Sequence, residues 1–132
     1  MYRLFSRLAL ASLLVVSPAQ SGRSDDGAVS ARVLDSRIDQ SVFNAIVAGS
    51  HLYAQKDVSG CYRLYQGALV AVEPLLAHRP DLRQAIVQGL KDAEGLKSDA
   101  PKALALRKVL DTVLTGLRSP NPNATPAAAT AS

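Results

Sequence analysis

The chain has 132 residues, a formal net charge of +4 and a single cysteine. This length fits one domain, and one cysteine excludes a domain stabilised by internal disulfides. Residues 1–19 contain two of the 15 Lys and Arg and none of the 11 Asp and Glu, so without them the charge falls to about +2. The remaining basic residues are mixed with acidic ones and form no basic run with aromatic residues, which argues against a nucleic-acid partner.

Residues 1–19 have the three regions of a cleavable export signal. Arg3 and Arg7 form a positive start, residues 8–16 are an apolar run too short to cross a bilayer, and small residues follow up to Ala19. The apolar side chains of the run cover every face of a helix, which does not fit an ordinary amphipathic helix. We therefore expect cleavage after this segment and a mature protein in the periplasm or outside the cell, with no membrane contact after cleavage.

Two segments of low apolar content flank the expected domain. Residues 20–37 are dominated by small and charged residues and predict a flexible linker, with at most a turn of helix around residues 31–34. Residues 119–132 are rich in Pro, Ala, Thr, Ser and Asn, which predicts a disordered tail. The folded domain is therefore expected over residues 38–118.

Within the domain, apolar residues recur at helical spacing in four stretches. The first covers about residues 39–55, and the second begins at residue 58 or 59 and ends or kinks at Pro74, which removes a backbone donor. The third begins at Pro80 and ends near Gly95, and the fourth lies between about residue 98 and Ser119. The residues expected on the apolar faces are Val42, Phe43, Ile46, Val47, Leu52, Cys61, Leu64, Tyr65, Ala68, Leu69, Val72, Leu82, Ile86, Leu90, Ala93, Leu104, Leu106, Val109, Leu110, Val113, Leu114 and Leu117.

The predicted fold class is all-α, because no stretch shows the period-two alternation of a half-buried strand. The connections between the four helices are only a few residues long, so neighbouring helices are expected to run antiparallel. This arrangement gives two helical hairpins around a common core. An ordered part of about 80 residues is enough for one such core.

The first hairpin contains the most specific pattern. Gly49, Leu52, Cys61, Tyr65 and Ala68 have the spacing of the Gly, apolar or aromatic, small, aromatic and Ala positions of a tetratricopeptide repeat. Gly49 and Cys61 are small where two antiparallel helices approach closely, and Tyr65 fills the groove beside them. The hairpin resembles a single tetratricopeptide-like helix pair, in which Gly49, Cys61, Tyr65 and Ala68 have structural roles.

Residues 52–80 and 105–111 are also similar to a small helical domain of uncharacterised exported bacterial proteins. That resemblance implies a domain type and no activity. The second hairpin does not repeat the tetratricopeptide spacing, so the peptide-binding surface of such arrays is not carried over.

Few residues indicate catalysis or metal binding. Cys61 with His51 or His78 would be needed for a thiolate–imidazole pair, but Cys61 is expected in a helix contact. His51 and His78 are also the candidates for a metal or haem ligand, although neither Cys-x-x-Cys-His nor His-Glu-x-x-His occurs. We therefore expect no enzyme activity and no cofactor.

Tyr53, Tyr62, Arg63 and His78 form the predicted contact surface for an unknown protein partner. Aromatic and arginine side chains are enriched in protein interfaces and supply much of their binding energy. The alternative for the tyrosines is an ordinary position at the core edge. The favoured prediction is an exported binding or accessory module without catalytic activity, and the alternative is a haem- or metal-binding helical domain that uses His51 or His78.

Overall fold

The computed structural model describes residues 23–124. It contains four α-helices and one short 3-10 helix: α1 (Arg23–Ala54), α2 (Val58–Val72), η1 (Glu73–Leu76), α3 (Pro80–Glu94) and α4 (Asp99–Arg118). This part of the chain has no strand, so the predicted all-α class is confirmed. None of the described helices has the length and apolar character needed to cross a membrane. The predicted export signal in residues 1–19 lies outside the described residues.

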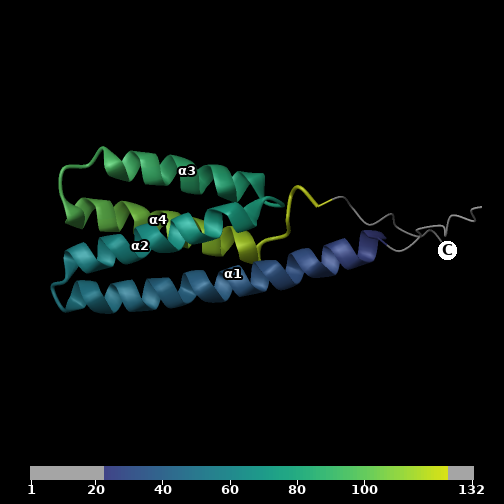
Figure 1. Cartoon of the computed structure of the whole chain (residues 1–132), viewed down its shortest axis with the longest axis horizontal. Coiled ribbons are helices and arrows are strands. Elements are labelled where there is room, and N and C mark those ends of the chain that lie inside the picture. Colours follow the sequence, from purple (N-terminus) through teal and green to yellow (C-terminus); the bar gives the residue numbers. More distant parts are fainter. Residues whose placement is uncertain (1–22, 125–132) are drawn as a thin grey trace, which may run out of the picture.

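The helices form one bundle in which consecutive helices reverse direction (Figure 1). α1 packs against α2 and α4, α2 also packs along α4, and α3 packs against α4. All four helices therefore share a single hydrophobic core. The core residues with at most 2% exposure are Ile38, Val42, Cys61, Leu69, Leu76, Ile86, Ala93, Ala103, Leu106, Leu110 and Val113.

Apart from the start of α1, local chemistry defines the helix ends close to where the sequence predicts them. Asp57 caps α2, because its Oδ1 accepts a hydrogen bond from the Gly60 amide at 2.8 Å. Lys56, just before this cap, has a φ of 70°, which ends α1 in the left-handed conformation. Pro74 converts the end of α2 into η1, and Pro80 is the first residue of α3.

α1 and α2 are in close contact at Gly49. A Cβ atom at this position would lie 2.1 Å from Cε1 of Tyr65, whose side chain is buried. Cys61 is buried on the same face of α2, and Ala68 is partly buried. The pair α3–α4 has the same kind of contact, because a Cβ at Gly89 would lie 2.3 Å from a methyl carbon of Val109. Glycines therefore set the spacing in both helix pairs.

The prediction of a flexible linker over residues 20–37 was wrong from Arg23 onward, because α1 begins there. Ala31 and Leu34 are partly buried and extend the inward face that continues at Ile38. Nine of the 15 residues from Arg23 to Arg37 are Ser, Asp, Gly or Val, which are weaker helix formers, so the helix here depends on contacts with the rest of the bundle, such as that of Asp35 with Arg79. The apolar content of this stretch is low because the rest of the bundle covers only one face of the helix.

Three residues expected in the core are exposed. Phe43 and Val47 on α1 are 46% and 54% exposed, and Leu104 on α4 is 54% exposed. The buried face of α1 is centred on Ile38 and Val42, and Phe43 and Val47 lie outside it. The sequence pattern combined two different faces of α1 into one.

We expect Gly49→Ala to lower the free energy of unfolding by about 1–3 kcal/mol, because the added Cβ overlaps the Tyr65 ring and forces the helices apart. Gly67→Ala in α2 is the matched control, since a Cβ there meets no atom within 4 Å. Its higher helix propensity should stabilise the protein by roughly 0.5–1 kcal/mol. Urea unfolding followed by circular dichroism measures both changes, and equal effects would contradict the close contact at Gly49.

Candidate functional site

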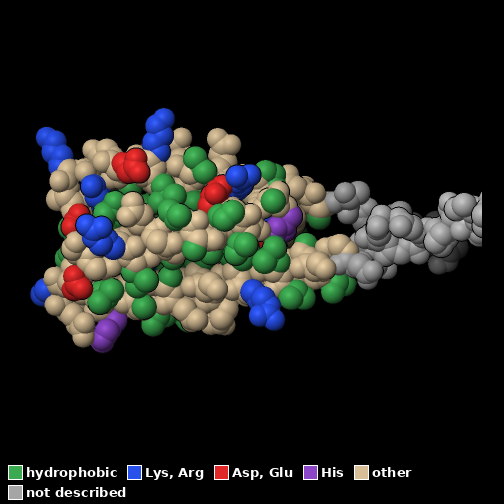
Figure 2. Space-filling view, in the orientation of Figure 1, with side chains coloured by type: hydrophobic (Ala, Val, Ile, Leu, Met, Phe, Trp, Pro, Cys, Tyr) green, Lys and Arg blue, Asp and Glu red, His purple; other side chains and the backbone are tan. Residues whose placement is uncertain are grey.

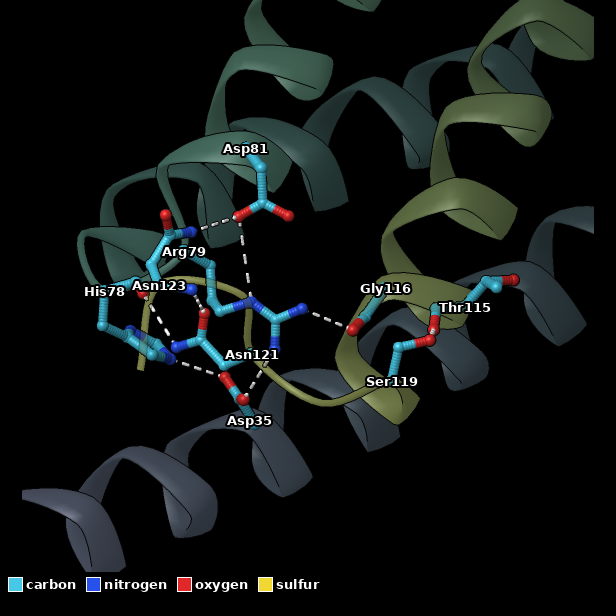
Figure 3. A network of polar contacts seen from close by, with 9 residues as sticks. All are labelled: Asp35, His78, Arg79, Asp81, Thr115, Gly116, Ser119, Asn121 and Asn123. Carbon is cyan, nitrogen blue, oxygen red and sulfur yellow. Dashed lines mark hydrogen bonds and ion pairs between the residues drawn. The ribbon is translucent and has the colours of Figure 1, made fainter. Parts of the chain in front are cut away.

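A cluster of polar side chains joins three helices at one end of the bundle (Figure 3). At its centre is Arg79, which lies between η1 and α3 and is 1% exposed. Its Nη1 donates to Oδ2 of Asp35 on α1 at 3.2 Å, and its Nη2 donates to the carbonyl oxygen of Gly116 on α4 at 2.5 Å. Its Nε has no hydrogen-bond partner among the described residues, and Oδ1 of Asp81 lies 3.9 Å away. The guanidinium therefore connects α1 to the start of α3 and the end of α4.

His78 shares the carboxylate of Asp35 with Arg79. Its Nε2 lies 2.5 Å from Oδ1 of Asp35, and both side chains are largely covered. This ring nitrogen is therefore already engaged, as Figure 3 shows.

The chain after α4 folds back over this cluster. The side chain of Asn121 donates to the carbonyl oxygen of His78 at 3.2 Å, and that of Asn123 donates to Oδ1 of Asp81 at 3.1 Å. The prediction of a disordered tail was therefore wrong for residues 119–124. The rest of the predicted tail, residues 125–132, lies outside the described residues.

A hollow of about 760 Å³ lies next to the cluster, between the first half of α1 and the end of α4. Its wall is made mainly of small and charged side chains, and its two acidic residues are paired with arginines. Asp39 accepts a hydrogen bond from Nε of Arg118 at 2.7 Å, and Asp35 is bound by Arg79. Neither histidine of the chain lines this hollow.

A smaller hollow of about 150 Å³ opens between α1 and α4 toward the other end of the bundle. We call it the α1–α4 notch, and its lining residues are Ser50, Tyr53, Cys61, Tyr65, Ala103, Leu104 and Arg107. Cys61 and Tyr65 are buried and form its floor, whereas Tyr53 and Leu104 are 39% and 54% exposed and form its rim. Arg107 crosses from α4 to α1, because its Nη1 donates to Oγ of Ser50 at 2.9 Å.

Of the four residues predicted as one contact surface, Tyr53, Tyr62 and Arg63 lie on either side of the α1–α2 connection, and His78 lies at the opposite end of α2. Tyr53 lines the notch, but Tyr62 and Arg63 do not. Tyr62 is partly buried, with Nζ of Lys102 lying 5.3 Å from its ring centre, and Arg63 is exposed on α2. His78 lies past the opposite end of α2, roughly 20 Å from Tyr62 along the chain's helical path. Only Tyr53 therefore belongs to a hollow with a defined shape.

Neither histidine is paired with Cys61. His51 is exposed and its Nε2 lies 3.0 Å from the side-chain nitrogen of Gln55, whereas His78 is held by Asp35. Burial raises the pKa of the Cys61 thiol, and the hydrogen bond with Tyr65 offsets this only in part. The thiol is therefore protonated at neutral pH and is not activated as a nucleophile. Within residues 23–124, no three His, Cys, Asp or Glu side chains are grouped as metal ligands would be.

Comparison with protein-family models, with curated proteins and with solved structures found no match for this chain. The tetratricopeptide-like resemblance of the first hairpin stays a prediction. Inferences about function therefore depend on the geometry of the notch, the polar cluster and the exposed helix faces.

Sequence reasoning missed three residues that define these sites. Arg79 lies between His78 and Pro80 in a helix connection, where no periodic pattern indicates burial. Leu104 follows the apolar spacing of α4 but points to the notch, and Arg107 resembles one half of an ordinary surface pair with Asp111, an ion pair that does form. The sequence therefore contains no signal for the notch, which forms only where α1 and α4 come together.

We expect Arg79→Ala to lower the free energy of unfolding by about 1.5–3 kcal/mol, because Oδ2 of Asp35 loses its charged donor and the Gly116 carbonyl loses one of its two donors, while His78 stays on the carboxylate. Arg118→Ala is the control, since this arginine also pairs with an aspartate of α1 but is 58% exposed. Its cost should not exceed about 1 kcal/mol. Urea unfolding of the two variants measures the difference, and similar losses would show that burial of Arg79 adds nothing.

The raised pKa of Cys61 predicts a loss of stability in alkali. The thiol ionises more easily in the unfolded chain, near its ordinary value of 9.0. The folded state therefore loses free energy relative to the unfolded state as the pH rises above that value. We expect the unfolding free energy of the wild type to fall more steeply between pH 8 and pH 10 than that of Cys61→Ala, and parallel pH curves from urea unfolding would contradict the burial of the thiol.

Proposed function

We propose that this chain is an exported, non-catalytic helical module that binds a protein partner through the α1–α4 notch. The observation that carries the proposal is the combination of an exposed aromatic ring, an exposed leucine and an arginine around a buried floor. Tyr53 and Leu104 form the exposed apolar rim, and Arg107, which also lines the notch, donates a hydrogen bond to Ser50. Side chains that insert into such partly apolar pockets dominate the binding energy of protein interfaces.

The size of the notch favours a side chain over a small molecule. Its volume of about 150 Å³ is below the range of roughly 300–1,000 Å³ that is usual for small-molecule sites. It suits one apolar side chain of a partner, such as Leu or Met. Arg107, which also lines the notch, would donate a hydrogen bond to a carbonyl or carboxylate oxygen next to that side chain.

The haem or metal alternative receives less support. The larger hollow has the volume of a ligand site, but neither His51 nor His78 lines it, and its acidic residues are engaged by arginines. The notch contains no histidine either. In both histidines the hydrogen bond engages Nε2, so Nδ1 would be the ring nitrogen that could bind a metal or haem iron without loss of that bond.

The compartment in this proposal comes from the predicted export signal in residues 1–19. Cys61, the only cysteine, is buried in the core and forms no disulfide. Outside the cytoplasm the module would therefore depend on helix packing and on the Arg79 cluster for its stability, and its partner would be another exported or surface protein.

A photo-crosslinking amino acid at position 53, introduced in cells that export the protein, tests the notch directly. We expect one main crosslinked protein in the exported fraction, identified by mass spectrometry. Leu104→Asp should reduce its yield by more than about tenfold, because a charge would enter the apolar rim. Val70→Asp is the matched control, since Val70 is 56% exposed on α2 and does not line the notch.

Two other results would overturn the notch as the contact site. Loss of the partner in Tyr62→Ala and Arg63→Ala, without loss in Leu104→Asp, would place the contact on α2. A haem absorbance band or a stoichiometric metal in the natively purified protein, abolished by His78→Ala or His51→Ala, would favour the cofactor alternative.

A further inference from the structure

The side of α1 that faces away from the bundle carries its own row of side chains. The row consists of Val29, Val33, Ser36, Gln40, Phe43 and Val47, which we call the outer stripe; of these six, Ser36 also lines the edge of the larger hollow. All six are exposed. The relative solvent exposure of the four apolar members is 59% for Val29, 50% for Val33, 46% for Phe43 and 54% for Val47. Their spacing alternates between four and three residues, which keeps them on one side of a helix over roughly 27 Å. Apolar side chains reach the surface along α1 at the lower edge of Figure 2.

The bundle does not use the outer stripe. The inward face of α1 contains Ile38 and Val42, which lie on the opposite side of the helix, and none of the six stripe residues belongs to the hydrophobic core. A row of half-exposed apolar side chains on one helix face is typical of an interaction surface.

The order of side chains along the outer stripe is symmetric about residue 38. In chain order it has two apolar, two polar and two apolar residues. An antiparallel second copy would place Val29 against Val47 of that copy and Val33 against its Phe43. Ser36 would then meet Gln40 of the second copy and hydrogen-bond with it. A two-fold interface needs such a self-complementary surface.

The position of the symmetry point supports the same occupant. Residue 38 lies within one residue of the midpoint of α1, which extends over Arg23–Ala54. Two antiparallel copies of α1 would therefore overlap along the whole helix. The stripe residues of one copy would all be covered, with no apolar member left beyond the end of the other helix.

We propose that two copies of this chain associate through the outer stripe, with their α1 helices antiparallel. Asp39 and Arg118, an ion pair beside the symmetry point, would meet the same pair of the second copy and form a group of two carboxylates and two guanidiniums. On the other side Arg37, which is exposed, would approach Arg37 of the second copy, and this repulsion weakens the association. Four half-exposed apolar side chains per copy form a small interface, so the dimer depends on concentration.

Sedimentation velocity over a roughly hundredfold range of concentration tests the association. We expect the purified protein to change from monomer to dimer over that range. Phe43→Ser combined with Val47→Ser should weaken the dimer by more than about tenfold, because it removes half of the apolar stripe. Val87→Ser on α3, where the side chain is also 54% exposed, should leave the dimer unchanged, and circular dichroism checks that all variants fold.

Engineered disulfides test the orientation. Val29→Cys mixed with Val47→Cys should form a mixed disulfide under mild oxidation, whereas Val29→Cys alone should not link to itself. The wild type, whose Cys61 is buried, serves as the unlinked control. Efficient linking of Val29→Cys to itself would indicate parallel helices and overturn the proposed arrangement. A monomer at every concentration would overturn the dimer and leave the outer stripe to a different protein.

Discussion

The ion pair between Arg79 and Asp35 fixes the first half of α1 to the rest of the bundle. The first half of α1 has few large side chains on its inward face, and Ala31 and Leu34 are only partly buried. Hydrophobic packing alone therefore holds this half weakly. The guanidinium of Arg79 compensates, because it binds Asp35 on α1 and the Gly116 carbonyl on α4 while it belongs to the start of α3. Burial of a charge is costly unless it is satisfied, so arrangements of the three helices that separate Arg79 from these partners are disfavoured.

Much of the fold follows from simple sequence signals. Proline at positions 74 and 80 and the apolar spacing of the last three helices predict helix boundaries that agree with the structure to within a few residues. Gly49 and Tyr65 also have the sizes that a close helix contact needs. These features are local, or depend on one neighbouring helix, and a single sequence can therefore reveal them.

The remaining features depend on partners that are distant in the sequence. The helical state of residues 23–37 depends on contacts such as that of Asp35 with Arg79, which are more than 40 residues apart. Phe43 and Val47 have the same spacing as core residues, and only the position of α2 and α4 decides which face of α1 is covered. The notch exists because Tyr53 and Leu104, about 50 residues apart, lie on the facing sides of two helices. None of these relations has a short-range pattern.

Because residues 119–124 fold back onto the bundle, the chain enters and leaves this domain at the same end. Ala28 on α1 and Ala124 line the same hollow, so the entry and exit points of the described chain are neighbours. The α1–α4 notch lies at the other end of α1, roughly 30 Å away. A domain with adjacent ends can be inserted into a loop of another protein, or tethered at either end, without strain. Such a tether leaves the far end of the bundle free, so that the notch can face outward from whatever holds the domain.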